Sequence, residues 1–393
     1  MGRVKFSSLI EKLPTYPFAK VRKVMKEVEK ERGVKIIDAR IGIPDVEAPK
    51  AIKKIVAKYL LKKNSTYGYP IDVYPERGID ELVSAIIEDY KKRYNVKLQP
   101  ENIAITSWSK YVLHNLPRLL APGRILIPEP IYPAYVSAVI LSQHQVKFIP
   151  TSAENNWLPK FEFKQGDVGF YFCDPNNPTG AVADEKFYSD LLKKVKKSGV
   201  IGIFDKAYKD YVFDNKIKPI SITQIPGLIN FGYEVVSFSK HYNFVGLGLG
   251  FIVSSKENID RWLKFADQFS QGVEWYKQQA GVEALNNFLV RKEIRKYFAE
   301  LKERRKIFIE GLNELGLKCS ASQATPYLWI KTPPNYEDDE KFVLEKLIPE
   351  AYVAFMPGSY FGKSGRGYFR ATLFVSRNNI KEILRRIKNV KDW

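Results

Sequence analysis

The feature that most constrains the fold is the alternation, through the middle of the chain, of short apolar runs with longer segments of helical pattern. One of these helical segments is well marked, because Asp184 can cap its start and Gly199 can end it. Strands joined through helices form mainly parallel sheets covered by helices, so we predict an α/β fold of that kind. The predicted strands are residues 102–106, 124–127, 145–150, 168–173, 200–204, 234–238 and 250–254.

The two ends of the chain have a different pattern. After about Phe265 charged helical segments dominate, and only short strand-like runs follow. The predicted elements of the two ends are a helix at 20–32, strands at 36–41, 327–331 and 367–374, and a last helix from Asn379. We therefore predict a large domain of residues 45–285 and a smaller α+β domain of residues 1–44 and 286–393.

The charge of the chain is strongly positive, with 63 Lys and Arg against 44 Asp and Glu, a net charge of +19. Such an excess is typical of nucleic-acid-binding proteins, but also of a lysine-rich solvated surface with affinity for anionic metabolites. The basic residues are spread through helical patterns such as 193–197 and form no dense tail. We therefore expect no nucleic-acid partner.

The sequence also limits where the protein resides. Two cysteines, Cys173 and Cys319, cannot form a disulfide framework, which favours a reducing compartment. Charges interrupt the apolar residues of the first 14 positions, and no run approaches the roughly 18–20 apolar residues of a spanning helix. We expect a cytoplasmic protein that does not bind membranes.

Polar and aromatic residues directly follow several predicted strands. They are the segment Asp174–Gly180, Asp205, the pair Ser239–Lys240, and Tyr132. In open α/β sheets, ligands bind beyond the carboxyl ends of the strands. Each residue alone is more often part of a turn or the core, but together a carboxylate, an amide, an amine and an aromatic ring at one sheet edge predict a binding site.

The order of these motifs resembles the pyridoxal-phosphate-dependent aminotransferases of fold type I, class I/II. The resemblance extends from Leu13–Pro17 to Phe369–Arg370, and Arg40–Asp45 looks most like the branch of aspartate and LL-diaminopimelate aminotransferases. It implies an enzyme that moves an amino group from an amino acid to a 2-oxo acid, with 2-oxoglutarate the expected acceptor. It also implies a ping-pong mechanism through a lysine-bound pyridoxal phosphate.

The resemblance assigns roles around the cofactor ring. Lys240 matches the lysine that forms the Schiff base and then carries the proton, because a desolvated lysine loses its proton readily. Asp205 resembles the carboxylate that keeps the pyridine nitrogen protonated, so that the ring acts as an electron sink. Tyr208 and Asn177 match the residues that bind the ring O3′. Tyr132 aligns with the aromatic residue that stacks on the ring.

The phosphate end departs from the family pattern. The residues matched to it are Ser107, Trp108, Ser109, Lys110 and Ser237. Trp108 stands where the family has a glycine, and Gly248 where it has a phosphate-binding arginine. One phosphate contact is therefore expected to be missing, and the alternative is that Lys110 or a neighbouring basic side chain replaces it. The run Gly246–Gly250 does not indicate a dinucleotide site, because its spacing is G-x-G-x-G and a predicted strand follows it.

The remaining matches concern substrate and subunit contacts. Arg370 resembles the arginine that grips the substrate α-carboxylate, together with Asn177, and Gly42 the glycine whose backbone lies against the substrate. Tyr67, with Tyr69 as the alternative, resembles the tyrosine lent to the neighbouring subunit, which implies a homodimer with shared active sites. Lys206 replaces the glutamate that usually follows the aspartate, and we interpret it as a surface exchange.

Two other functions fit parts of this pattern. A β- or γ-eliminating lyase on the same fold would share Lys240, Asp205 and Arg370, but would release ammonia without an acceptor 2-oxo acid. A DNA-binding regulator with this fold would need an additional N-terminal domain. Because the family-like region begins by about Leu13, we do not expect one.

Overall fold

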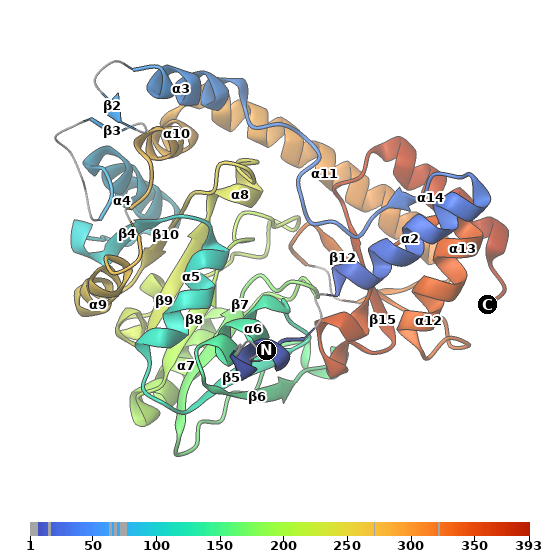
Figure 1. Ribbon diagram of the computed structural model, residues 1–393, viewed down its shortest axis with the longest axis horizontal. Helices are drawn as coiled ribbons and strands as arrows, with labels where there is room; N and C mark the ends of the chain where they lie inside the picture. The colour runs from blue at the N-terminus through green and yellow to red at the C-terminus, as the bar shows by residue number, and fades with distance from the viewer. Residues whose placement is uncertain are drawn as a thin grey trace, which may run out of the picture.

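The structure, a computed structural model, describes residues 7–14, 17–62, 77–270, 272–320 and 323–393, and the backbone of 65–66 and 69–70. Two sheets of different size lie at opposite ends of the elongated molecule (Figure 1). A 27-residue helix, α11 (Phe288–Glu314), runs between them. In the described part of the chain, no helix is long and apolar enough to cross a membrane.

The larger sheet has seven strands in the order β4-β10-β9-β8-β7-β5-β6. Only β10 runs antiparallel to its neighbours, which confirms the mainly parallel sheet. The strands are β4 (Ile103–Thr106), β5 (Arg124–Glu129), β6 (Gln145–Pro150), β7 (Asp167–Cys173), β8 (Ile201–Asp205), β9 (Gly232–Ser237) and β10 (Gly250–Val253). Each predicted strand of the middle region is present, with ends shifted by two residues or fewer.

Helices cover both faces of this sheet, so successive residues of one strand enter different cores. In β5, Ile125 and Ile127 pack against one side, whereas Leu126 packs against the other. The covering helices are α3 (Lys50–Leu60), α4 (Asp80–Tyr94), α5 (Ser109–Asn115), α6 (Ala134–Leu141), α7 (Glu185–Ser198), α9 (Lys256–Ala266) and α10 (Trp275–Asn286). Asp184 caps α7 through a bond from the Phe187 amide, and Gly199 ends it in the left-handed conformation, as predicted.

The smaller sheet has the order β11-β12-β15-β14, and β1 pairs in parallel with β13 beside it. Its elements are α2 (Phe18–Arg32), β1 (Ile37–Asp38), β11 (Cys319–Ser320), β12 (Tyr327–Lys331), α12 (Asp339–Lys341), α13 (Ile348–Ala351), β13 (Val353–Ala354), β14 (Met356–Pro357), β15 (Tyr368–Thr372) and α14 (Arg377–Val390). The remaining short elements are α1 (Ser8–Glu11), which precedes α2, and β2 (Ser65–Thr66) paired with β3 (Tyr69–Pro70), which lie between α3 and α4. We propose the domain boundaries at 45 and 286, between the two sheets.

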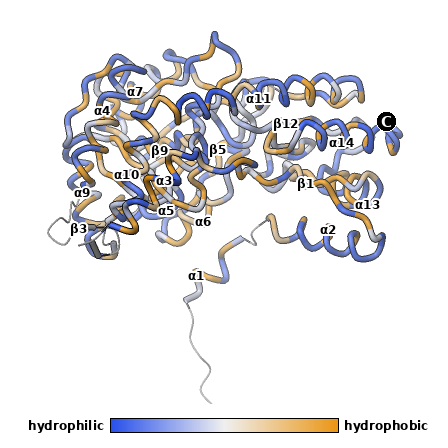
Figure 2. Tube along the Cα trace, turned by 90° about the horizontal axis from the view of Figure 1, so that it is seen from above, coloured by the Kyte–Doolittle hydropathy of each residue, from blue (hydrophilic) through white to orange (hydrophobic). Residues whose placement is uncertain are grey.

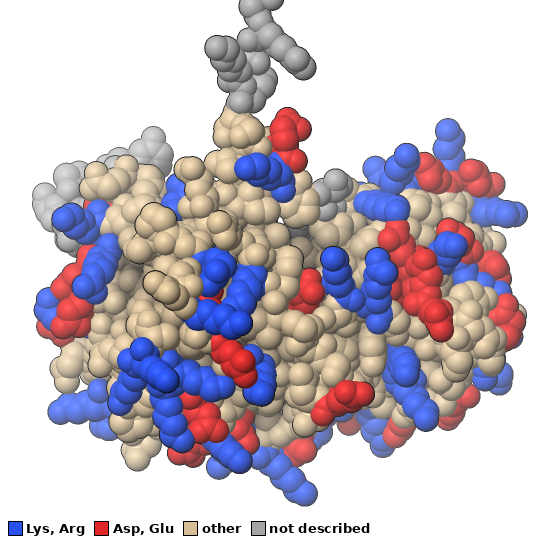
Figure 3. All heavy atoms as spheres, turned by 90° about the horizontal axis from the view of Figure 1, so that it is seen from below, with Lys and Arg blue, Asp and Glu red and all other residues tan. Residues whose placement is uncertain are grey.

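Charge and hydropathy are distributed as in an ordinary globular protein. Hydrophilic residues predominate along the outer helices α2 and α11 (Figure 2). On the face shown in Figure 3, Lys and Arg are interspersed with Asp and Glu. This mixture fits a solvated surface, and the absence of a nucleic-acid partner stays a prediction.

Candidate active site

A cavity of about 410 Å³ lies at the carboxyl ends of the parallel strands, between the two sheets. The predicted site residues that line it are Gly42, Trp108, Ser109, Lys110, Tyr132, Asn177, Asp205, Tyr208, Ser237, Lys240 and Arg370. Ser107 is not among its lining residues. Residues that sequence reasoning missed also line it, among them Phe18, Arg22, Tyr135, Cys173 and Tyr327.

Lys240 projects from the short helix α8 (Phe238–His241), which begins directly after β9. Phe238, predicted as the last strand residue, starts this helix because the Ser237 hydroxyl accepts a bond from the Ser239 amide and caps it. The Lys240 Nζ donates to the Gly42 carbonyl at 2.6 Å. Burial and then the Arg370 charge lower the pKa of Lys240 to about 8, whereas Asp205 opposes this shift.

Asp205 ends β8 and is buried at the cavity wall. Its Oδ2 accepts a bond from the Tyr135 hydroxyl at 2.5 Å, and its Oδ1 accepts from the Ala207 amide at 3.0 Å. Burial raises the pKa of Asp205, while these two bonds and the Lys240 charge oppose the rise. Sequence reasoning missed Tyr135; its place three residues after Tyr132, at the start of α6, was the signal that could have found it.

Arg370 lies on β15 of the smaller sheet and reaches across to the larger one. It donates to the Asn177 Oδ1 at 2.7 Å and to the Arg40 carbonyl at 2.8 Å. Its guanidinium carbon lies 4.1 Å from the ring centroid of Tyr327, whose hydroxyl is 2.8 Å from that of Tyr208. The buried Nε of Arg370 bonds to no atom of the described residues, so it can still donate to an anionic ligand.

Comparison with known proteins agrees with this geometry. The model of the family "Aminotransferase class I and II" matches residues 34–387. The chain belongs to this family. It is 35% identical over 395 residues to an LL-diaminopimelate aminotransferase of Aquifex aeolicus, covering 98% of this chain and 99% of the relative. A second one, from Maridesulfovibrio salexigens, is 33% identical and covers 99% of this chain and 100% of the relative.

Solved structures have the same fold. Substrate-bound BacF from Bacillus subtilis superposes with a TM-score of 0.89 at 29% identity, covering 99% of this chain and 98% of that one. Aspartate aminotransferase from Thermus thermophilus with maleate superposes with a TM-score of 0.88 at 23% identity, covering 99% and 100%. The fold type I architecture and the assignment as a pyridoxal-phosphate-dependent aminotransferase are therefore confirmed.

The cavity of this aminotransferase fits that cofactor. The buried carboxylate of Asp205 suits the pyridine nitrogen, and the amine of Lys240 suits the aldehyde. Hydroxyl groups at the start of α5 and α8 suit the phosphate. The hydroxyl groups are those of Ser109, Ser237 and Ser239.

Trp108, at the start of α5, and Gly248 both depart from the family pattern, and they pack directly against each other. A Cβ built on Gly248 would lie 2.1 Å from Cε2 of Trp108, and Gly248 has a φ of +66°. The indole therefore occupies the volume that a side chain at position 248 would need, and its Nε1 donates to the Val245 carbonyl at 3.2 Å. Lys277, buried and paired with Glu274 at 2.7 Å, has its Nζ 5.4 Å from the indole centroid.

The interpretation of Lys206 as a surface exchange is wrong. Its side chain is buried, and its Nζ donates to Asp174 Oδ2 at 2.7 Å and to the Tyr188 hydroxyl at 2.6 Å. Desolvation is offset because the charge has both an opposite charge and a hydrogen-bond acceptor. Lys206 therefore ties the strand end that carries Asp205 to the loop after β7.

Two predicted residues cannot be placed fully. Tyr67 lies outside the described residues. Tyr69 belongs to the backbone of β3, and its side chain is not described. Which of the two reaches a neighbouring subunit stays a prediction.

Proposed function

We propose that this aminotransferase uses 2-oxoglutarate as acceptor and works by a ping-pong mechanism. The observation that carries the proposal is a half-buried Lys240 amine with a pKa of about 8, which shares the cavity with the Asp205 carboxylate and the Arg370 guanidinium and interacts with both charges. An amine of this kind is partly deprotonated near neutral pH, as a proton carrier must be.

The residues of the cavity would hold pyridoxal phosphate as follows. Asp205 would bind its pyridine nitrogen, and Tyr208 and Asn177 its O3′. Tyr132 would stack on the ring. The phosphate would be bound by Trp108, Ser109, Lys110 and Ser237 of the cavity, and Ser107, which lies outside the cavity lining, stays a predicted phosphate residue. When bound, the cofactor supplies an electron sink for the negative charge that develops on the substrate Cα.

The other roles belong to protein groups. Lys240 accepts the proton from Cα and returns it at the other end of the reacting system. Its bond to the Gly42 carbonyl holds the amine on the Gly42 side of the cavity. Gly42 must be a glycine, because a Cβ there would lie 2.0 Å from the Tyr327 hydroxyl. Arg370 holds the α-carboxylate, with Asn177 and Tyr327 keeping its guanidinium in place.

The donor is proposed from the relatives. LL-Diaminopimelate is the substrate that their names state, and we propose it, or a similar amino acid with a polar far end, for this chain. We further propose a cytoplasmic homodimer in which Tyr67 or Tyr69 of each subunit completes the other's phosphate site.

A panel of amino-acid donors with 2-oxoglutarate tests this function. We expect glutamate to form with at least one donor, and initial rates to give parallel double-reciprocal lines. Ammonia and a 2-oxo acid produced in the absence of 2-oxoglutarate would support the lyase instead. Intersecting lines would contradict the ping-pong order but not the transfer itself.

A further inference from the structure

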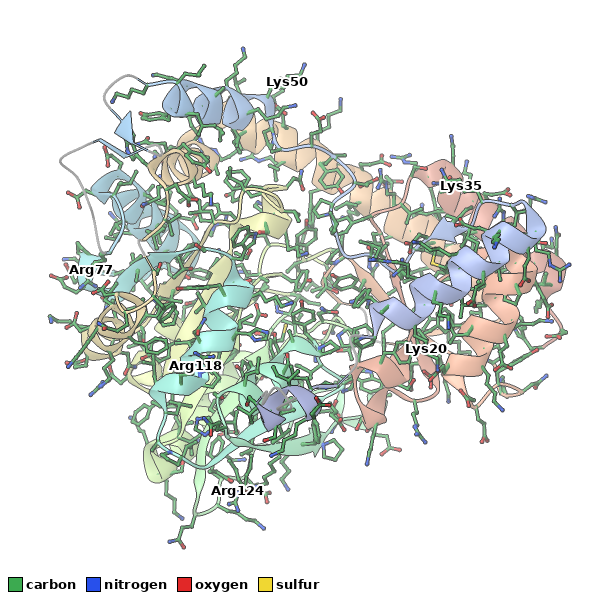
Figure 4. All side chains as sticks on the ribbon, in the orientation of Figure 1. Lys20, Lys35, Lys50, Arg77, Arg118 and Arg124 are labelled. Atoms are coloured by element: carbon green, nitrogen blue, oxygen red, sulfur yellow. The ribbon has the colours of Figure 1, made fainter. Side chains whose placement is uncertain are left out.

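The wall of the cavity opposite the large sheet contains an arginine without an assigned role. Helix α2 buries Val21, Met25 and Val28 in the core. Phe18 and Arg22 lie one turn apart on α2, and both line the cavity. Lys20, labelled in Figure 4, lies in the first turn of α2, which is the end of the helix nearer the large sheet.

The guanidinium of Arg22 makes no hydrogen bond or ion pair with any of the described residues. The carboxylate that influences it is Asp38, but Arg40 binds this group: the Arg40 Nε lies 3.1 Å from the Asp38 Oδ1. Arg40 itself is buried and also contacts Met25 Sδ and the Phe18 carbonyl. Arg22 is exposed, so its guanidinium can turn toward a ligand without breaking a bond.

We propose that Arg22 determines substrate specificity by binding a carboxylate at the far end of the substrate. This inference rests on the proposed function, in which Arg370 takes the α-carboxylate. A planar guanidinium suits a second carboxylate because it can donate two parallel bonds. Both cations lie on elements of the smaller sheet region, so one substrate would join α2 to β15.

The surroundings of Arg22 define the substrate class further. Phe18, Ile41 and Ile43 line the same cavity as the two guanidinium groups and add apolar surface to it. A substrate with a chain of methylene groups between its reacting end and its distal carboxylate matches this arrangement. We therefore infer an amino acid with a distal carboxylate, in preference to one with a neutral or basic far end.

Among the described residues, Lys110 is the other exposed cation that lines the cavity, and it belongs to α5 beside Trp108. Its position beside Ser109 suits the phosphate end of the cofactor. The roles of Lys110 and Arg22 can be separated experimentally, because their loss has different effects. Loss of a phosphate contact weakens cofactor binding whatever the substrate, whereas loss of a distal contact weakens the binding of acidic substrates alone.

The experiment compares Arg22→Gln, Arg22→Lys, Lys110→Gln and Arg32→Gln. Arg32 is an exposed arginine in the last turn of the same helix and does not line the cavity, so it is the matched control. Steady-state kinetics are measured with acidic and with neutral donors. Calorimetry measures binding of glutarate, a dicarboxylate that cannot react, and of butyrate, its monocarboxylate counterpart.

We expect Arg22→Gln to raise KM for acidic donors about 10-fold, the loss of one charge-assisted contact at an exposed site, with kcat nearly unchanged. Glutarate binding should weaken equally, whereas butyrate binding and neutral donors should not change. Arg22→Lys should recover part of the loss, and Arg32→Gln should behave as the wild type.

Equal effects on acidic and neutral ligands, or no effect on either, would overturn the role of Arg22 while leaving the aminotransferase function intact. Weaker glutarate binding in Arg22→Gln, together with no amino-group transfer from any donor in the wild type, would support the role of Arg22 but contradict the proposed function. Unchanged glutarate binding in Arg22→Gln with weaker binding in Lys110→Gln would assign the distal carboxylate to Lys110.

Discussion

The inner wall of the cavity and its phosphate end are held by different means. At the inner wall, Asp205 and Arg370 each make two hydrogen bonds, and all but the part-buried bond from the Ala207 amide to Asp205 are buried. At the phosphate end, Trp108 is 45% exposed, and its indole contacts Gly248 through van der Waals packing. From this difference we infer that the buried hydrogen-bond network of the inner wall tolerates few substitutions. Two residues in van der Waals contact, such as those at 108 and 248, can both be substituted if their summed volume is conserved.

The largest effect should come from the ion pair behind the inner wall. Lys206→Met leaves the Asp174 carboxylate buried without its counter-charge, so we expect the free energy of unfolding to fall by about 3–5 kcal/mol. Denaturant unfolding measures it. Lys193→Met is the control, because Lys193 pairs with Asp190 at 2.8 Å on the surface, where such a pair contributes about 0–1 kcal/mol. Similar losses in both variants would contradict the structural role of Lys206.

Within the inner wall itself, Asp205→Asn should lower turnover by about 10²–10³-fold while thermal unfolding changes little. The amide keeps an oxygen for the Ala207 N–H but loses the negative charge. Asp214→Asn, at an exposed position, serves as the matched control and should retain wild-type turnover. A rate for Asp205→Asn close to that of the control would remove Asp205 from the mechanism.

The phosphate end is tested by a double-mutant cycle. Gly248→Ala places a Cβ against the indole and should weaken pyridoxal phosphate binding by about 10–100-fold, the range expected for overpacking costs of about 1–3 kcal/mol. Trp108→Ala removes the obstacle, so the double variant should bind better than the sum of the single effects predicts. Equilibrium dialysis of the cofactor gives the four affinities. Strict additivity would show that the two residues do not compensate each other.

The smallest expected effect is a shift in the pH at which the rate of pyridoxal phosphate uptake is half-maximal. Uptake of pyridoxal phosphate by the cofactor-free protein needs a neutral Lys240 amine, so its rate should rise with pH and level off above about 8. Asp205 raises the pKa of Lys240 and Arg370 lowers it. Asp205→Asn should therefore move the midpoint to lower pH, and Arg370→Gln to higher pH. A shift opposite to the predicted one in either variant would show that the charge removed there does not act on the amine directly.

The sequence predicted the residues whose positions follow from strand ends. Asp205 and Lys240 come directly at or after parallel strands, so topology alone places them at one edge. Tyr327 and Arg22 could not be found in this way. They enter the cavity from the smaller sheet and from α2, and contacts between distant segments have no signal in local periodicity.

The error at Lys206 has a related physical cause. A lysine after a strand is usually solvated, and its burial depends on two partners distant in sequence, Asp174 and Tyr188. The same holds for the contact between Trp108 and Gly248, which are distant in sequence: only the structure shows that the indole fills the space beside Gly248. The loss of one phosphate contact at Gly248 stays a prediction.

The central claim is that Lys240 is the amine that binds the cofactor. Borohydride reduction of the protein loaded with pyridoxal phosphate, followed by peptide mapping, tests it most directly. We predict one pyridoxyl group per chain, on Lys240, and none in Lys240→Ala treated in the same way. A label spread over exposed lysines, or retained in Lys240→Ala, would contradict the account.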